Sequence, residues 1–150
     1  DALGVACQLL EEPSLLAGGG ATQIALARHL RRFAESFAGR EQLAIEAFAD
    51  ALEIIPRTLA QNAGLDPLDS LLQTVAEQST HDGPNAHHIG LNVEHKGPGN
   101  MVEDGIVEPL RITRQVLAGA TEAALSVLRI DDVLWAKQDP SVPDLPDEDA

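Results

Sequence analysis

Ala17-Gly18-Gly19-Gly20-Ala21 interrupts an otherwise helical pattern. Three consecutive glycines are unsuited to a helix interior, because each costs up to about 1 kcal/mol there relative to alanine. Glycines also let the backbone come close to another group, and the helix that follows has a positive N-terminal end. The motif therefore predicts either a flexible connector between rigid parts or a turn against an anionic or sugar-bearing ligand. It is not a Walker-type loop, because no Lys-Ser/Thr pair follows.

Helical periodicity continues on the C-terminal side of these glycines. Residues 22–37 predict an amphipathic helix, and residues 40–63 predict a second one that Pro56 should kink or break. Asp66-Pro67 is a cap followed by a proline, which predicts a third helix to about residue 78. The side chains expected to face the core of the first two helices are Ile24, Ala27, Leu30, Phe33, Ala34 and Phe37, then Leu43, Ala47, Leu52, Ile55 and Leu59.

The remaining segments complete a mainly α chain. Residues 1–12 have helical spacing, and residues 89–93 are a short strand between turn residues, which predicts a hairpin near 89–97. Glu108-Pro109 should open a long, buried helix to about Trp135. Residues 137–150 are rich in proline and acid, which predicts a disordered acidic tail.

Composition excludes several classes of function. The chain has 150 residues and a net charge of −14, which opposes binding to nucleic acid or to an anionic membrane. No apolar run approaches the roughly 20 residues of a membrane span, and the single Cys7 rules out an internal disulfide. We therefore expect a cytoplasmic protein. Because the first residue is Asp1 and not Met, we expect the chain to be an internal part of a longer protein.

Polar residues at three places could carry chemistry. Asp1 and Glu108 each precede a predicted helix, where an acid commonly offsets the helix dipole. Glu108 also adjoins the glycine-rich strand region, so it could instead accept hydrogen bonds from ligand hydroxyls. Four histidines lie close together, but their spacing matches no known metal site, and we assign no metal ligand. They are His81, His87, His88 and His95.

In combination and in this order, several stretches resemble group II chaperonins, the thermosome and TCP-1 family. The resemblance extends from Asp1 to about Ala136. The matching stretches are residues 1–3, Ala17-Gly-Gly-Gly-Ala21, residues 39–60, Asn62-Ala-Gly-Leu-Asp66, Gly105-Ile-Val-Glu-Pro109, Ala120-Thr-Glu-Ala-Ala124 and Leu128-Arg-Ile-Asp-Asp132.

This resemblance implies a role for individual residues. Asp1 matches the family's catalytic acid, which orients or activates the water that attacks the γ-phosphate. Gly18 and Gly19 belong to a turn that contacts bound nucleotide, Gly90 lies by the sugar and adenine, and Glu108 accepts from the sugar hydroxyls. The glycines would then act as a hinge as well, on which the helix bearing Asp1 closes over the nucleotide.

The resemblance also implies a domain assignment. Residues 1–16 would be the last helix of the intermediate domain, and residues 17–136 the C-terminal half of the equatorial ATP-binding domain. The phosphate-binding loop and the main ligand of Mg²⁺ would lie in the missing N-terminal half. The isolated chain should therefore be inactive, with part of its apolar core exposed.

The implied function is that of an ATPase whose cycle of ATP and ADP drives ring closure and the folding of non-native proteins. Its partners would be unfolded protein clients and identical or paralogous subunits in a stacked double ring. The alternative is an all-α interaction or scaffold module that descends from a chaperonin and has lost its ATPase activity.

Overall fold

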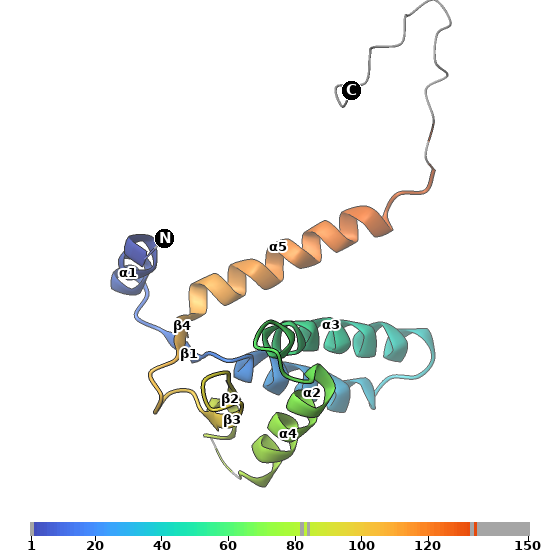
Figure 1. Cartoon of the computed structure of the whole chain (residues 1–150). Helices are drawn as coiled ribbons and strands as arrows, with labels where there is room; N and C mark the ends of the chain where they lie inside the picture. The colour runs from blue at the N-terminus through green and yellow to red at the C-terminus, as the bar shows by residue number, and fades with distance from the viewer. Residues whose placement is uncertain (1, 82, 84, 133, 135–150) are drawn as a thin grey trace, which may run out of the picture. The chain divides into compact units, whose positions relative to one another are not determined.

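The computed structural model describes residues 2–81, 83, 85–132 and 134. Asp1, Trp135 and the predicted tail at 137–150 lie outside the described residues. Helices predominate and the strands are short, so the mainly α prediction is confirmed (Figure 1). The elements in order are α1 (Ala2–Glu11), β1 (Leu15–Ala17), α2 (Ala21–Ala34), α3 (Arg40–Asn62), α4 (Pro67–Thr80), the 3₁₀ turn η1 (Ala86–His88), β2 (Ile89–Asn92), β3 (Gly97–Asn100), β4 (Val107–Pro109) and α5 (Leu110–Leu128).

Two compact units divide the chain after Arg114, so α5 begins in the first unit and continues into the second. All the elements before α5 belong to the first unit. The residues of the candidate site described below also belong to it.

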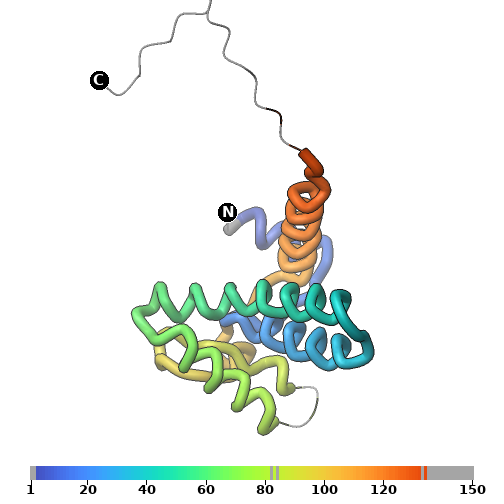
Figure 2. Tube along the Cα trace, turned by 90° about the vertical axis from the view of Figure 1, so that its right-hand side faces the viewer, coloured from blue at the N-terminus to red at the C-terminus, as the bar shows by residue number. Residues whose placement is uncertain are grey.

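Helices α2 and α3 run antiparallel and side by side in both views (Figures 1 and 2). Small residues on the facing sides let the two backbones approach closely. The buried residues of the pair include Ala21, Ile24, Ala27 and Ala34 on α2, and Ala49, Leu52, Pro56 and Ala60 on α3.

An ionic cluster links the same two helices. Glu53 on α3 is only 3% exposed, and it accepts hydrogen bonds from Arg31 on α2 and from Arg57 on α3. Arg31 also pairs with the exposed Asp50 at 2.8 Å. The hydrogen bond with Glu53, more than any other effect, raises the pKa of the Arg31 guanidinium above its ordinary value. Arg31 therefore stays charged, which compensates the buried carboxylate.

The first unit also contains two short antiparallel β-ladders. The predicted hairpin is confirmed: β2 pairs with β3, with Gly90 opposite Gly99. Strand β1 pairs with β4, with Leu16 opposite Glu108. This second ladder was not predicted, because it joins segments far apart in the sequence.

Several predicted boundaries need correction. Helix α2 spans Ala21–Ala34, so it ends three residues before the predicted end at residue 37. Helix α3 continues through Pro56, so Pro56 does not break it, and the alternative of a kink stays a prediction. Glu108 lies in β4 and does not cap the long helix, which starts at Leu110.

The predicted buried faces were also partly wrong. On α3, Leu43 is 65% exposed and Ile55 is 42% exposed, whereas Leu52 is buried as predicted. The helix buries the face of Ala49, Leu52, Glu53 and Pro56 because this face meets α2 and the glycine turn. Most of α5 is exposed too, and Thr113 is its one buried residue among those described, contrary to the buried helix that we predicted.

Candidate functional site

The three glycines form a tight turn that starts α2. Gly19 and Gly20 have φ angles of 61° and 74°, in the left-handed region that favours glycine. The Ala21 N–H donates to the Gly18 carbonyl at 3.0 Å, and the Ile24 N–H donates to the Gly20 carbonyl at 3.0 Å. No side chain caps the start of α2, where Gly18 and Gly20 are buried and Gly19 is half-buried.

The turn is packed by other backbone segments. The Gly18 N–H donates to the Ile106 carbonyl at 2.9 Å, and the Leu91 N–H donates to the Gly19 carbonyl at 2.8 Å. A Cβ atom on Gly20 would lie 2.7 Å from the Pro56 Cβ. These constraints favour a fixed turn that needs close approach over a flexible connector.

Gly90 packs directly behind this turn. A Cβ atom there would lie 2.7 Å from the Gly18 carbonyl oxygen and 3.0 Å from the Ala21 Cβ. Gly18 in turn packs against Ile106, with 2.9 Å between an added Cβ and the Ile106 Cγ2. Both glycines thus let the β2–β3 and β1–β4 segments approach the turn.

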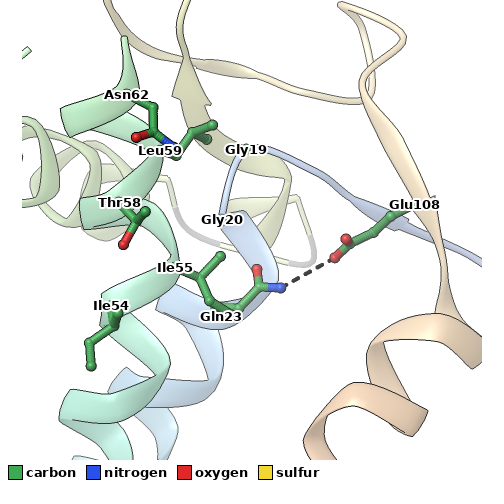
Figure 3. A pocket seen from close by; sticks show the side chains of 9 residues that line it. All are labelled: Gly19, Gly20, Gln23, Ile54, Ile55, Thr58, Leu59, Asn62 and Glu108. Atoms are coloured by element: carbon green, nitrogen blue, oxygen red, sulfur yellow. Dashed lines mark hydrogen bonds between the residues drawn. The ribbon is translucent and has the colours of Figure 1, made fainter. Parts of the chain in front are cut away.

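One cavity of about 450 Å³ lies on the side of the turn that faces α3 (Figure 3). This volume is within the range of about 300–1,000 Å³ that small-molecule sites occupy. Apolar and polar side chains from α3 line it, together with Gln23 from α2 and Glu108 from β4. The lining residues are Gly19, Gly20, Gln23, Ile54, Ile55, Thr58, Leu59, Asn62 and Glu108.

Gln23 and Glu108 form a polar pair at this cavity. The Gln23 Nε2 donates to the Glu108 Oε1 at 3.3 Å, which Figure 3 shows as a dashed line. Gln23 is 6% exposed, and its Oε1 is buried without a hydrogen-bond partner among the described residues. An unsatisfied buried acceptor costs about 1–3 kcal/mol.

The structure brings together some of the predicted site residues. Gly19 and Glu108 line the same cavity, whereas Gly18 and Gly90 lie behind the turn and are not among its lining residues. Asp1 lies outside the described residues.

Sequence reasoning missed Gln23 and the wall from α3. Gln23 is adjacent to Ile24 and four residues before Ala27, so a helical projection could have placed it near the buried face. Ile55 and Leu59 were assigned to the core, and the structure places both at the cavity.

The histidines do not gather into a metal centre. Among the described residues, no group of three or more His, Cys, Asp or Glu side chains could hold a metal ion. His81 instead lies 3.2 Å from Glu77 on α4, and the rings of His87 and His88 contact each other edge to face.

The cavity fits the nucleoside part of a nucleotide. Ile54, Ile55 and Leu59 offer an apolar surface for a flat ring, and the Glu108 carboxylate is an acceptor for hydroxyl donors. The same lining has no basic side chain for phosphates. The described residues thus fit a sugar and a base, and they supply no ligand set for Mg²⁺.

Comparison with known proteins identifies the family of this chain. A model of the TCP-1/cpn60 chaperonin family matches residues 1–138. The chain is 52% identical over 138 residues to a thermosome subunit of Methanocaldococcus jannaschii, covering 92% of this chain and 25% of the relative. It is 53% identical over 136 residues to thermosome subunit 1 of Haloferax volcanii, covering 91% of this chain and 24% of that one.

A solved structure agrees with the sequence comparison. The open-state monomer of a group II chaperonin from Methanococcoides burtonii matches with a TM-score of 0.72 and 40% identity. The match covers 77% of this chain and 28% of that chain. The chain therefore belongs to the TCP-1/cpn60 chaperonin family, as the sequence resemblance indicated.

The chain spans about a quarter of the length of the curated relatives it matches. No helix in the described part of the chain has both the length and the apolar character of a membrane span.

Proposed function

We propose that this chain is the C-terminal part of an ATP-driven chaperonin subunit and that the cavity beside Gly19 holds the nucleoside part of ATP or ADP. In this proposal residues 1–16 end the intermediate domain, residues 17–136 form the C-terminal half of the equatorial domain, and residues 137–150 are the tail. The observation that carries it is the presence of Gly19, Gly20, Gln23 and Glu108 around one cavity with an apolar wall.

Each part of the cavity has a distinct task in this proposal. Glu108 accepts hydrogen bonds from the sugar hydroxyls, and Ile55 and Leu59 exclude water from one face of the base. Gly19 lines the cavity, and a side chain there would collide with Met101 and Leu91, so a glycine keeps the turn packed against these residues. The phosphates and Mg²⁺ would be held by residues from another part of the subunit.

The proposal assigns the chemistry to Asp1. Phosphoryl transfer depends mainly on positioning the attacking water and neutralising charge, and a carboxylate next to the γ-phosphate orients that water. In the complete subunit ATP supplies the phosphoryl group, and its hydrolysis would accompany domain closure.

The same proposal names the partners. Family membership supports assembly with other subunits and action on non-native proteins. We propose a stacked double ring of identical or paralogous subunits in the cytoplasm, with unfolded proteins as clients. Exposed apolar side chains on α3, among them Leu43 and Phe48, are consistent with a chain that packs against further parts of a larger subunit.

The test is nucleotide affinity in the complete subunit with Glu108→Ala. Removing hydrogen bonds to a charged group costs about 1.5–3 kcal/mol, so we expect the dissociation constant of ADP to rise about 10- to 100-fold. Equilibrium dialysis or isothermal titration calorimetry measures this change.

Glu94→Ala is the matched control. Glu94 is an exposed acid in the β2–β3 turn and does not line the cavity, so its variant should bind ADP like the parent. Equal affinity of the Glu108→Ala and Glu94→Ala variants would contradict the nucleotide proposal and would favour a scaffold module without ATPase activity.

A further inference from the structure

A second cavity lies on another side of α2, away from the one described above. It has a volume of about 210 Å³. Gln23 lines the first cavity and Ala25 lines the second, and at about 100° per residue these two positions face about 160° apart around the helix. The two cavities therefore lie on nearly opposite sides of α2.

The side chains that line this second cavity include four basic or imidazole groups and, among the described residues, no carboxylate. Arg28, His29 and Arg32 come from α2, and His87 comes from the 3₁₀ turn η1. Like charges four residues apart on a helix are neighbours and repel each other. Such a concentration of donors is unfavourable unless an opposite charge accompanies it.

The two arginines lack such a charge within the described part of the chain. Arg31, on the same helix, binds Asp50 and Glu53, whereas Arg28 and Arg32 have no hydrogen-bonded or ionic side-chain partner among the described residues. This contrast arises in a chain with 24 acids and 10 bases, in which carboxylates are plentiful. The guanidinium groups of Arg28 and Arg32 thus keep N–H donors for a ligand.

A buried glutamine holds the two walls of this cavity together. Gln78 on α4 is 1% exposed, and its Nε2 donates to the Ala21 carbonyl at 3.0 Å and to the Ile89 carbonyl at 2.7 Å. Ala21 begins α2 and Ile89 follows η1, so one side chain ties the arginine wall to the wall of His87. The ring of His87 also contacts the ring of His88 edge to face. Fixed walls reduce the ordering cost of binding a ligand.

We propose that this second cavity binds a small inorganic oxyanion of the phosphate type. Arg28 and Arg32 supply positive charge, and the imidazole rings of His29 and His87 each have an N–H donor in either protonation state. The volume is below the roughly 300 Å³ at which small-molecule sites begin, which favours a free anion over a nucleotide. The net charge of −14 opposes a long polyanion. This site goes beyond the proposed function and does not depend on it.

The test is binding of inorganic phosphate to the complete subunit, measured by isothermal titration calorimetry without nucleotide or Mg²⁺. We expect saturable binding to the parent. Arg28→Gln and Arg32→Gln should each weaken phosphate binding about tenfold or more, because each removes a charged hydrogen-bond donor. Glutamine has a helix propensity close to that of arginine, so α2 should still form.

Arg40→Gln is the matched control. Arg40 is an exposed arginine at the start of α3 and does not line this cavity, so its variant should bind phosphate like the parent. The ADP affinity of the Arg28 and Arg32 variants should also equal that of the parent, because neither arginine lines the proposed nucleoside cavity.

Three results would overturn the proposal. The first is the absence of saturable phosphate binding to the parent. The second is equal phosphate affinity in the parent, Arg28→Gln and Arg32→Gln, since the anion would then bind elsewhere. The third is a parallel loss of phosphate and ADP affinity in these variants, which would show that the arginines act through the fold. Failure of the proposed nucleotide function in the Glu108→Ala test would leave the oxyanion site unaffected.

Discussion

Replacing Asp1 with alanine in the complete subunit is expected to leave ATP binding intact and to reduce turnover by about 10²- to 10⁴-fold, the usual contribution of a positioned acid or base. Asp1 precedes α1 in the sequence, and its role follows from the proposed function. The cavity proposed to bind the nucleoside is formed by residues of α2, α3 and β4 and by the glycine turn, so the loss of Asp1 should not affect affinity. Single-turnover hydrolysis and ADP binding, measured on the same preparation, separate the two effects.

Glu41→Ala is the control for this change. Glu41 is an exposed acid in the first turn of α3 and lies outside the cavity lining, so its removal should change neither rate nor affinity. An unchanged hydrolysis rate in Asp1→Ala would contradict the proposal that Asp1 is the catalytic acid.

Replacing Gly20 with alanine should strongly destabilise the fold. Gly20 has a φ of 74°, and a Cβ atom there would meet the Pro56 Cβ at 2.7 Å and its Cα at 3.2 Å. A left-handed conformation costs an alanine about 1–2 kcal/mol, and overpacking a rigid neighbour costs about 1–3 kcal/mol more. We expect a total loss of roughly 2–5 kcal/mol, measured as a lower midpoint of thermal unfolding and faster hydrogen exchange over residues 17–27.

Gly64→Ala separates the two causes. Gly64 follows α3 with a φ of 72°, and an added Cβ would meet no atom within 4 Å. This variant should lose only the conformational part, about 1–2 kcal/mol. Equal effects of the two variants would show that contact between the glycine turn and Pro56 does not matter for stability.

Local signals in the sequence predicted the elements that depend on neighbouring residues. Asp66 caps α4 as expected, and its side chain accepts from the N–H groups of Leu68 and Asp69 at 2.9 and 2.8 Å. The β2–β3 hairpin also follows from a short apolar run between turn residues. Such features need no information from distant parts of the chain.

Features that depend on distant contacts were missed or misjudged. Pro56 should interrupt a helix, yet its ring is buried against Gly20, and this packing accompanies an unbroken α3. The pairing of β1 with β4 joins Leu16 to Glu108, and nothing local to Glu108-Pro109 distinguishes a strand end from a helix start. The buried face of α3 includes Glu53, and its hydrogen bonds with Arg31 and Arg57 compensate the burial of its charge.

The candidate site also contains residues that the sequence predicted and one that only the folded structure reveals. The resemblance to chaperonins gave Gly19 and Glu108, and both line the cavity. It did not give Gln23, because the importance of that residue lies in one hydrogen bond across the cavity and one acceptor without a donor. Neither property can be deduced from spacing along the chain.

The most direct test of the central claim is the position of the nucleotide in a structure of the complete subunit with bound ADP. The account predicts sugar hydroxyl oxygens within about 2.5–3.0 Å of the Glu108 carboxylate, with the base against the α3 wall beside Gly19. A nucleotide bound elsewhere, with only solvent between Glu108 and Ile55, would contradict it.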